Sequence, residues 1–288
     1  MELTIKNSLG KEVVFTNQLP ITINNYSDEG INVIVASNKG IEQDGETYLN
    51  NSLDKRQLTL TYTISADTLE ELAKLKREIY NTINPKLGQC EIILDTGIEK
   101  HRIVGTIEKV PEYNFIAKYV EQSTIRFICH SPFWKNYIDS KVNIAMWKGS
   151  FHFPLMIPQS KGIIMGHREP NLIVNVNNTG DVKTGMLIEF FARGTLKNPS
   201  LFNVNTREFI KVNKTMVSGE KITINTNYSK KKIESTVNGV TTNVLNLIDL
   251  DSTFLQLDTG DNLFRYDSDQ NLDNLEVNIY FNPQYLGV

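Results

Sequence analysis

Cysteines and long apolar runs are both scarce in this sequence. Only two cysteines occur among the 288 residues, Cys90 and Cys129, and each lies within an apolar strand pattern. Two thiols cannot form a disulfide framework, so we expect both to be buried and free. No stretch approaches the roughly 18 consecutive apolar residues of a membrane-spanning helix, and residues 1–6 lack the apolar core of a secretory signal. We therefore expect a protein that is made in the cytoplasm, stays soluble and does not insert into membranes.

An excess of one charge is also missing. The 30 lysines and arginines nearly balance the 33 aspartates and glutamates, which gives a net charge of −3 and a sequence pI of about 5.9. A surface that binds nucleic acid would carry a clear basic excess, so we expect no sequence-specific binding of nucleic acid. Apolar residues make up 40% of the chain, which is enough for a core, and the length indicates two domains of ordinary size.

Residue patterns for catalysis or metal binding are scarce as well. The four histidines stand in no two-ligand spacing with Cys, Asp or Glu. Cys129 and His130 are neighbours in a strand pattern, so their side chains would point to opposite faces. The nucleophile elbow, the phosphate-binding glycine loop and the H-E-x-x-H helix do not occur in the sequence. We predict a protein that is not an enzyme and uses no cofactor, although a site built from residues distant in the sequence stays open.

The stretch 267–273 is the best candidate for a metal site. Its carboxylates and amides at alternate positions could converge on Ca²⁺, which prefers oxygen ligands. A calcium loop also needs Gly at its sixth position and Glu at its twelfth, where this sequence has Leu272 and Asn278. We therefore favour a polar hairpin at 267–273, with calcium binding as the alternative.

The first half of the chain predicts an antiparallel β domain over residues 1–134. Its clearest strand is 57–64, where apolar residues alternate with threonine and glutamine, as in a half-buried sheet. The other strands are expected at 2–5, 13–15, 21–23, 31–35, 91–94, 101–107 and 123–129.

One helix is predicted within this half. Asp67 and Glu70 fit a capping box at its start, and Pro85 and Gly88 end it. An apolar stripe at helical spacing predicts a face that packs on the sheet, formed by Leu69, Leu72, Leu75, Ile79 and Ile83.

The stretch 36–56 loses the apolar pattern almost entirely. A polar stretch of this length inside a compact domain is either mobile or ordered by a partner. We interpret 36–56 as an arm that is unordered alone and ordered by a neighbouring subunit, with Asp44, Gly45 and Arg56 as its candidate contact residues.

The strand at 123–129 ends at Pro132, which cannot donate a backbone hydrogen bond to a sheet. Two large aromatic residues, Phe133 and Trp134, follow directly. We interpret Pro132, Phe133 and Trp134 as the joint between two domains, where the aromatic side chains would pack and fix the angle.

The second half, 135–288, predicts a β-sandwich or jelly roll. Short apolar strands recur between turn signals such as Asn238-Gly239 and Gly260-Asp261-Asn262, and no helix pattern interrupts them. Sandwiches of this kind often bind glycans through exposed aromatic side chains. Trp147 is the least constrained aromatic residue here, and we therefore name it as the possible glycan contact.

Several motifs, in their order along the chain, resemble the distal tail proteins of long non-contractile-tailed bacteriophages, or of a prophage in a low-GC Gram-positive host. In the first half these are the Asp44-Gly45 turn with Arg56 and strand 57–64, the helix at 68–83 with Pro85 and Gly88, and the Cys129–Trp134 strand end. In the second half they are 178–181, Gly194, Asn198-Pro199, Gly219, 222–226 and 260–262. The resemblance covers nearly the whole chain.

This resemblance implies a structural role without catalytic residues. Proteins of the family form a hexameric ring at the end of the tail tube, as one ring or as two rings back to back, and DNA passes through the ring. The resemblance implies that the N-terminal domains make the ring and that the C-terminal domains are galectin-like sandwiches. The implied partners are further copies of this chain, the tail tube protein, the tail hub and receptor-binding proteins.

The resemblance also places the protein at the virion tail tip after synthesis in the cytoplasm of the host bacterium. The alternative function is that of a carbohydrate-binding adhesin acting through the C-terminal sandwich. It predicts glycan binding by the second half of the chain, through an exposed aromatic residue such as Trp147.

Overall fold

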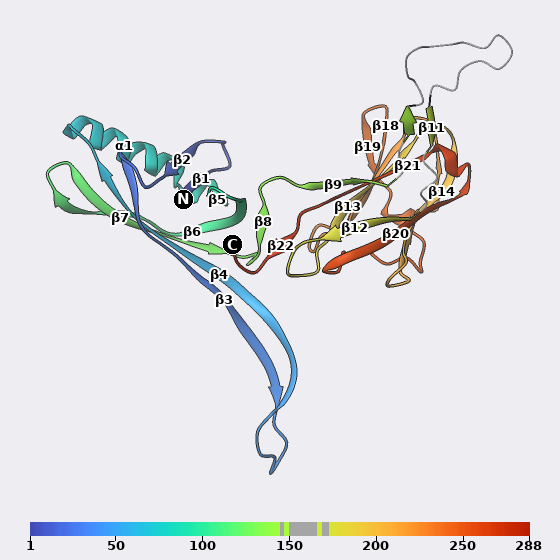
Figure 1. Ribbon diagram of the computed structural model, residues 1–288, viewed down its shortest axis with the longest axis horizontal. Helices are drawn as coiled ribbons and strands as arrows, with labels where there is room; N and C mark the ends of the chain where they lie inside the picture. The colour runs from blue at the N-terminus through green and yellow to red at the C-terminus, as the bar shows by residue number, and fades with distance from the viewer. Residues whose placement is uncertain (145–146, 150–165, 169–172) are drawn as a thin grey trace, which may run out of the picture. The chain divides into compact units, whose positions relative to one another are not determined.

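A computed structural model describes residues 1–144, 147–149, 166–168 and 173–288, with the backbone alone for 147–149 and 166–168. The chain forms two compact units (Figure 1). The first consists of Met1–Tyr137 and Tyr285–Val288, and the second of Ile138–Gln284. The predicted boundary between residues 134 and 135 therefore differs from the observed one at Tyr137. The predicted second domain also included Tyr285–Val288, which lie in the first unit, because a returning strand of two residues is too short to show a burial pattern in the sequence.

The first unit is built on one antiparallel sheet. Its strands follow the order β2-β1-β5-β6-β7-β4-β3, and β8 joins at β6 and pairs in turn with β22. The strands are β1 (Glu2–Lys6), β2 (Glu12–Phe15), β3 (Ile21–Asn38), β4 (Thr47–Ser65), β5 (Cys90–Asp95), β6 (Lys100–Ala117), β7 (Val120–Cys129), β8 (Trp134–Asn136) and β22 (Gln284–Tyr285).

The two ends of this strand order meet beside Thr16, which directly follows β2. The Thr16 N–H donates to the Ile21 carbonyl at 3.3 Å, and the Ile23 N–H donates to the Thr16 carbonyl at 2.7 Å. The sheet thereby closes around its apolar core.

The alternation in β4 confirms the clearest strand prediction. Leu58, Leu60, Tyr62 and Ile64 are buried on one face, while the threonines between them are half-buried on the other. This is the period of two that a half-buried strand requires.

The helix α1 (Leu69–Thr82) packs against β2 and β4. It begins differently from the prediction. Thr68 is the N-cap, and its hydroxyl accepts from the Glu71 N–H at 3.2 Å, while the Glu71 carboxylate accepts from the Asp67 N–H at 3.2 Å. Asp67 is thus not the cap. The prediction was wrong by one residue because two possible cap residues stand side by side.

The apolar stripe of α1 is confirmed in its later turns and wrong at its start. Leu72, Ile79 and Ile83 are buried, but Leu69 is 66% exposed. The Tyr80 hydroxyl also donates to the Pro111 carbonyl of β6 at 3.0 Å, which fixes the helix to the sheet. A short 3₁₀ turn, η1 (Pro85–Leu87), follows the helix.

The second unit is a sandwich of two antiparallel sheets, which confirms the predicted fold class. One sheet has the order β12-β20-β14-β15 with β16 beside β14, and the other has the order β19-β18-β17-β13-β21-β9. The strands are β9 (Ser140–Asn143), β12 (Ile173–Asn178), β13 (Met186–Ala192), β14 (Leu196–Asn203), β15 (Phe209–Lys211), β16 (Thr215–Met216), β17 (Lys221–Asn225), β18 (Lys232–Val237), β19 (Val240–Asn243), β20 (Gly260–Gln270) and β21 (Leu275–Phe281). The prediction that this sandwich is galectin-like stays a prediction.

The core of the second unit lies between the two sheets. Ile188 and Phe190 of β13 and Val277 of β21 face Phe264 and Tyr266 of the other sheet, and all are buried. Two short 3₁₀ turns, η2 (Leu245–Leu247) and η3 (Leu272–Asn274), connect strands. β10 (Trp147–Gly149) and β11 (Gly166–Arg168) pair as a separate two-stranded antiparallel sheet.

Candidate functional site

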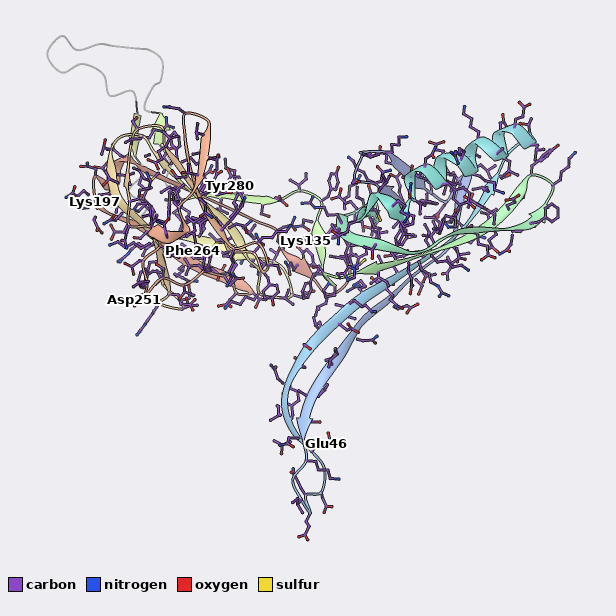
Figure 2. The ribbon with its side chains drawn as sticks, turned by 180° about the vertical axis from the view of Figure 1, so that it is seen from behind. Glu46, Lys135, Lys197, Asp251, Phe264 and Tyr280 are labelled. Atoms are coloured by element: carbon purple, nitrogen blue, oxygen red, sulfur yellow. The ribbon has the colours of Figure 1, made fainter. Side chains whose placement is uncertain are left out.

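The hairpin of β3 and β4 extends well past the rest of its sheet. β4 pairs with β7 only from Arg56 to Ser65, so Thr47 to Lys55 pairs with β3 alone. We call residues 31–55 the ribbon. Figure 1 shows β3 and β4 running together away from the other strands of the first unit, and Figure 2 labels Glu46 near the far end.

The ribbon corrects the prediction that 36–56 is unordered alone. Backbone pairs run from Ile31 opposite Arg56 to Asn38 opposite Thr47, so most of the stretch is strand. Both faces of a two-stranded ribbon meet solvent, so no burial pattern marks it in the sequence. Asp44 and Gly45 lie in the exposed loop between the strands, where Gly45 has a φ of 79°.

The ribbon exposes large apolar side chains and long strand edges. Val33, Ile34 and Val35 are each more than half exposed, and Ile41 at the tip is 99% exposed. Over residues 31–55, each of the two strands has one edge without a strand partner among the described residues. An exposed apolar edge of this kind is a template for pairing with another chain.

Arg56 cannot be a contact of the arm, which corrects its predicted role. Its side chain is 1% exposed and forms an ion pair with Asp28. The Nε atom also donates to the Pro132 carbonyl at 2.7 Å, and Nη2 donates to the Leu286 carbonyl. The residue lies at the base of the ribbon, where β4 enters the full sheet.

Trp134 is a core residue of the first unit, and its predicted packing across a joint between domains stays a prediction. It is fully buried in that unit's apolar cluster, and its indole N–H donates to the Asp28 carboxylate at 3.1 Å. Pro132 is buried, and its carbonyl accepts from Arg56. Phe133 is half-buried, and its role in a joint stays a prediction.

The side chains of 267–273 do not converge as a calcium site. Hydrogen bonds from Lys211 and Asn198 occupy the Asp269 carboxylate and hold its pKa below the ordinary value. The Ser268 hydroxyl donates to backbone carbonyls instead. Among the residues that the structure describes, no cluster of three potential metal ligands occurs. None of the helices described is long and apolar enough to cross a membrane.

Two outer aromatic rings of the sandwich stack on cations, whereas Tyr228 is 91% exposed. Arg265 lies 5.5 Å from the ring centre of Phe202, and Lys141 lies 5.2 Å from that of Tyr280. A ring that stacks on a cation offers less of its face to a sugar. The side chain of Trp147 lies outside the described residues, so its predicted glycan contact stays a prediction.

The two cysteines are buried and free, as predicted. Burial raises the pKa of the Cys90 thiol to about 11 and that of Cys129 to about 12. Both therefore stay protonated at neutral pH and are poor nucleophiles.

The family model "Phage tail protein RIFT-related domain" matches residues 8–129, and the model "Siphovirus-type tail component, C-terminal domain" matches residues 179–285. The chain belongs to the distal tail protein family of siphoviruses, and it is a structural component of a phage tail.

Solved structures share the fold over nearly the whole chain. The Dit protein of phage SPP1, described as a hub of the adsorption apparatus in phages that infect Gram-positive bacteria, matches with 13% identity and a TM-score of 0.66 over 98% of each chain. A chain of the phage P2 baseplate in its activated conformation with Ca matches with 12% identity and a TM-score of 0.58, over 100% of this chain and 99% of that one. No curated protein sequence matches.

Proposed function

We propose that this protein is a ring-forming hub at the tail tip, which joins the end of the tail tube to the tail hub or baseplate and its receptor-binding parts. The ribbon is the observation that carries this proposal. Its exposed apolar side chains and unpaired strand edges suit a neighbouring copy, because added strands gain backbone hydrogen bonds and apolar burial together.

The number of copies follows from the family resemblance, which indicates six around a channel for DNA. A head-to-tail contact between identical chains closes into a ring when the rotation between neighbours allows it. The protein acts as a structural part of the virion, without catalysis and without sequence-specific binding of DNA, after synthesis in the host cytoplasm. The adhesin alternative is not favoured.

Light scattering across a range of protein concentrations tests the proposal. Wild-type protein should reach the mass of a hexamer or of two hexamers. The double variant Val33→Glu/Val35→Glu places two charges on one face of the ribbon and should remain monomeric. Val240→Glu, at an exposed position on the edge strand β19 of the second unit, is the matched control and should assemble normally. Equal masses for all three proteins at every concentration would overturn the role of the ribbon.

A further inference from the structure

The base of the ribbon is an irregular point in β3. The pairing register with β4 shifts between Asp28 and Ile31 and again between Ile31 and Val33. Gly30 has a φ of 74° there, and its N–H donates to Oδ1 of Asp28 at 3.0 Å. A bulge bends its strand and increases the local twist. The conformation of residues 28–31 therefore sets the direction in which the ribbon leaves the sheet.

The same Asp28 carboxylate is held from its other oxygen. Oδ2 accepts from the Arg56 guanidinium and from the Trp134 indole N–H, the latter at 3.1 Å. Trp134 is fixed by the core, and Arg56 lies directly opposite Ile31 in the ladder. The bulge is thus connected through one carboxylate to two buried side chains.

Arg56 connects the bulge to two further segments of the first unit. Its Nε donates to the Pro132 carbonyl, and its Nη2 donates to the Leu286 carbonyl, so each of its three nitrogens has an acceptor from a different segment. A guanidinium presents its donors in a rigid planar fork, which an ammonium group does not reproduce. A buried charge of this kind is tolerated only with its full set of partners.

We propose that Asp28, Arg56 and Trp134 are positioning residues that fix the direction of the ribbon before assembly, so that a second copy of this chain meets a preorganised arm. The inference rests on the proposed self-association and adds which residues fix the direction of the ribbon. Preorganisation strengthens binding because less conformational entropy is lost on association.

The conservative variant Arg56→Lys tests the inference, because it keeps the charge and removes the fork. Two readouts are measured on the full chain: hydrogen exchange of the backbone amides at 28–33, and the dissociation constant of self-association by light scattering. We expect faster exchange at 28–33, with exchange in the second unit unchanged, and self-association weakened by about tenfold or more. Asp28→Asn removes the charge with little change in shape. It serves as the second variant if Arg56→Lys fails to fold, and it should change both readouts in the same direction but by less.

A matched control is Lys86→Arg, at an exposed position of the first unit outside the ribbon, which should leave both readouts unchanged. Unchanged exchange at 28–33 in both Arg56→Lys and Asp28→Asn would overturn the inference. If Val33→Glu/Val35→Glu prevents assembly while Arg56→Lys assembles like the wild type, the three residues do not position the ribbon for assembly. The proposed function then stands without this inference. If the ribbon variant itself assembles normally, the proposed function fails, and exchange at 28–33 alone then decides whether the three residues fix the base of the ribbon.

Discussion

The carboxylate of Glu220 is buried in the second unit and bonded on all sides. Lys214 lies 2.8 Å from it, the Val217 N–H donates at 3.0 Å, and the Ser235 hydroxyl donates as well. Burial alone would raise the pKa of Glu220, but these hydrogen bonds outweigh burial and lower it. The ionised form is therefore the one that stabilises the sandwich.

We expect Glu220→Gln to lower the free energy of unfolding by about 3 kcal/mol at neutral pH, because Lys214 loses its partner. The folded pKa lies below the unfolded value of about 4.3. The stabilisation is therefore complete above that unfolded value and is lost as the pH falls through the folded pKa. Urea denaturation at neutral and at acidic pH checks this. Glu234→Gln, which removes the more exposed pair with Lys232, should change stability by less than about 1 kcal/mol. A Glu220→Gln protein as stable as the wild type at neutral pH contradicts the assignment.

Gly185 lies against the backbone of a neighbouring segment. A Cβ atom added there would lie 2.6 Å from the Asn227 Cα and 2.8 Å from the Asn227 N. Gly185→Ala should therefore cost about 2 kcal/mol through forced backbone movement. Gly287→Ala is the control, since a Cβ at that position meets no atom within 4 Å. Thermal unfolding of the two variants should separate them clearly, and a normal melting temperature for Gly185→Ala would argue against the close contact.

At the scale of elements, the start of α1 provides a test of which residue caps it. Thr68→Ala should lower the free energy of unfolding by about 1 kcal/mol, because the Glu71 N–H loses its acceptor. Asp67→Ala should change it by less than about 0.5 kcal/mol, because the Asp67 backbone N–H, rather than its side chain, bonds to Glu71. Denaturant titration of both variants measures the difference, and a larger loss for Asp67→Ala would restore the predicted cap.

The elements that the sequence predicts well are those with one buried face. The strand at 57–64 and the later turns of α1 alternate because burial selects apolar residues at fixed spacing. The far half of β4 carries no such pattern, since both of its faces are exposed, and the stretch 36–56 therefore looks irregular in the sequence.

Arg56 was singled out from the sequence with the wrong role, and Trp134 with a role in a domain joint that stays a prediction. The partners of Arg56 are distant along the chain, at Asp28, Pro132 and Leu286, and no local spacing predicts such contacts. A buried arginine and a surface arginine look the same in a single sequence. Trp134 likewise follows a proline at the end of a strand, which resembles a linker until β8 is seen to pair with β6.

At the scale of the whole molecule, the proposed ring depends on the ribbon as the surface that would bind a second copy. Thiol labelling can test the role of the ribbon with little background from Cys90 and Cys129, because both native thiols are buried and have raised pKa values. A new cysteine on the ribbon is therefore the one thiol that a maleimide should label quickly in the folded protein.

The most direct measurement is maleimide labelling of Val35→Cys as a function of protein concentration. We expect rapid labelling of the dilute monomer and strong protection at concentrations where light scattering shows assembly. Val240→Cys in the second unit is the control and should be labelled rapidly throughout. Equal labelling of Val35→Cys in the monomer and in the assembly would show that the ribbon stays free and would contradict its proposed role in self-association.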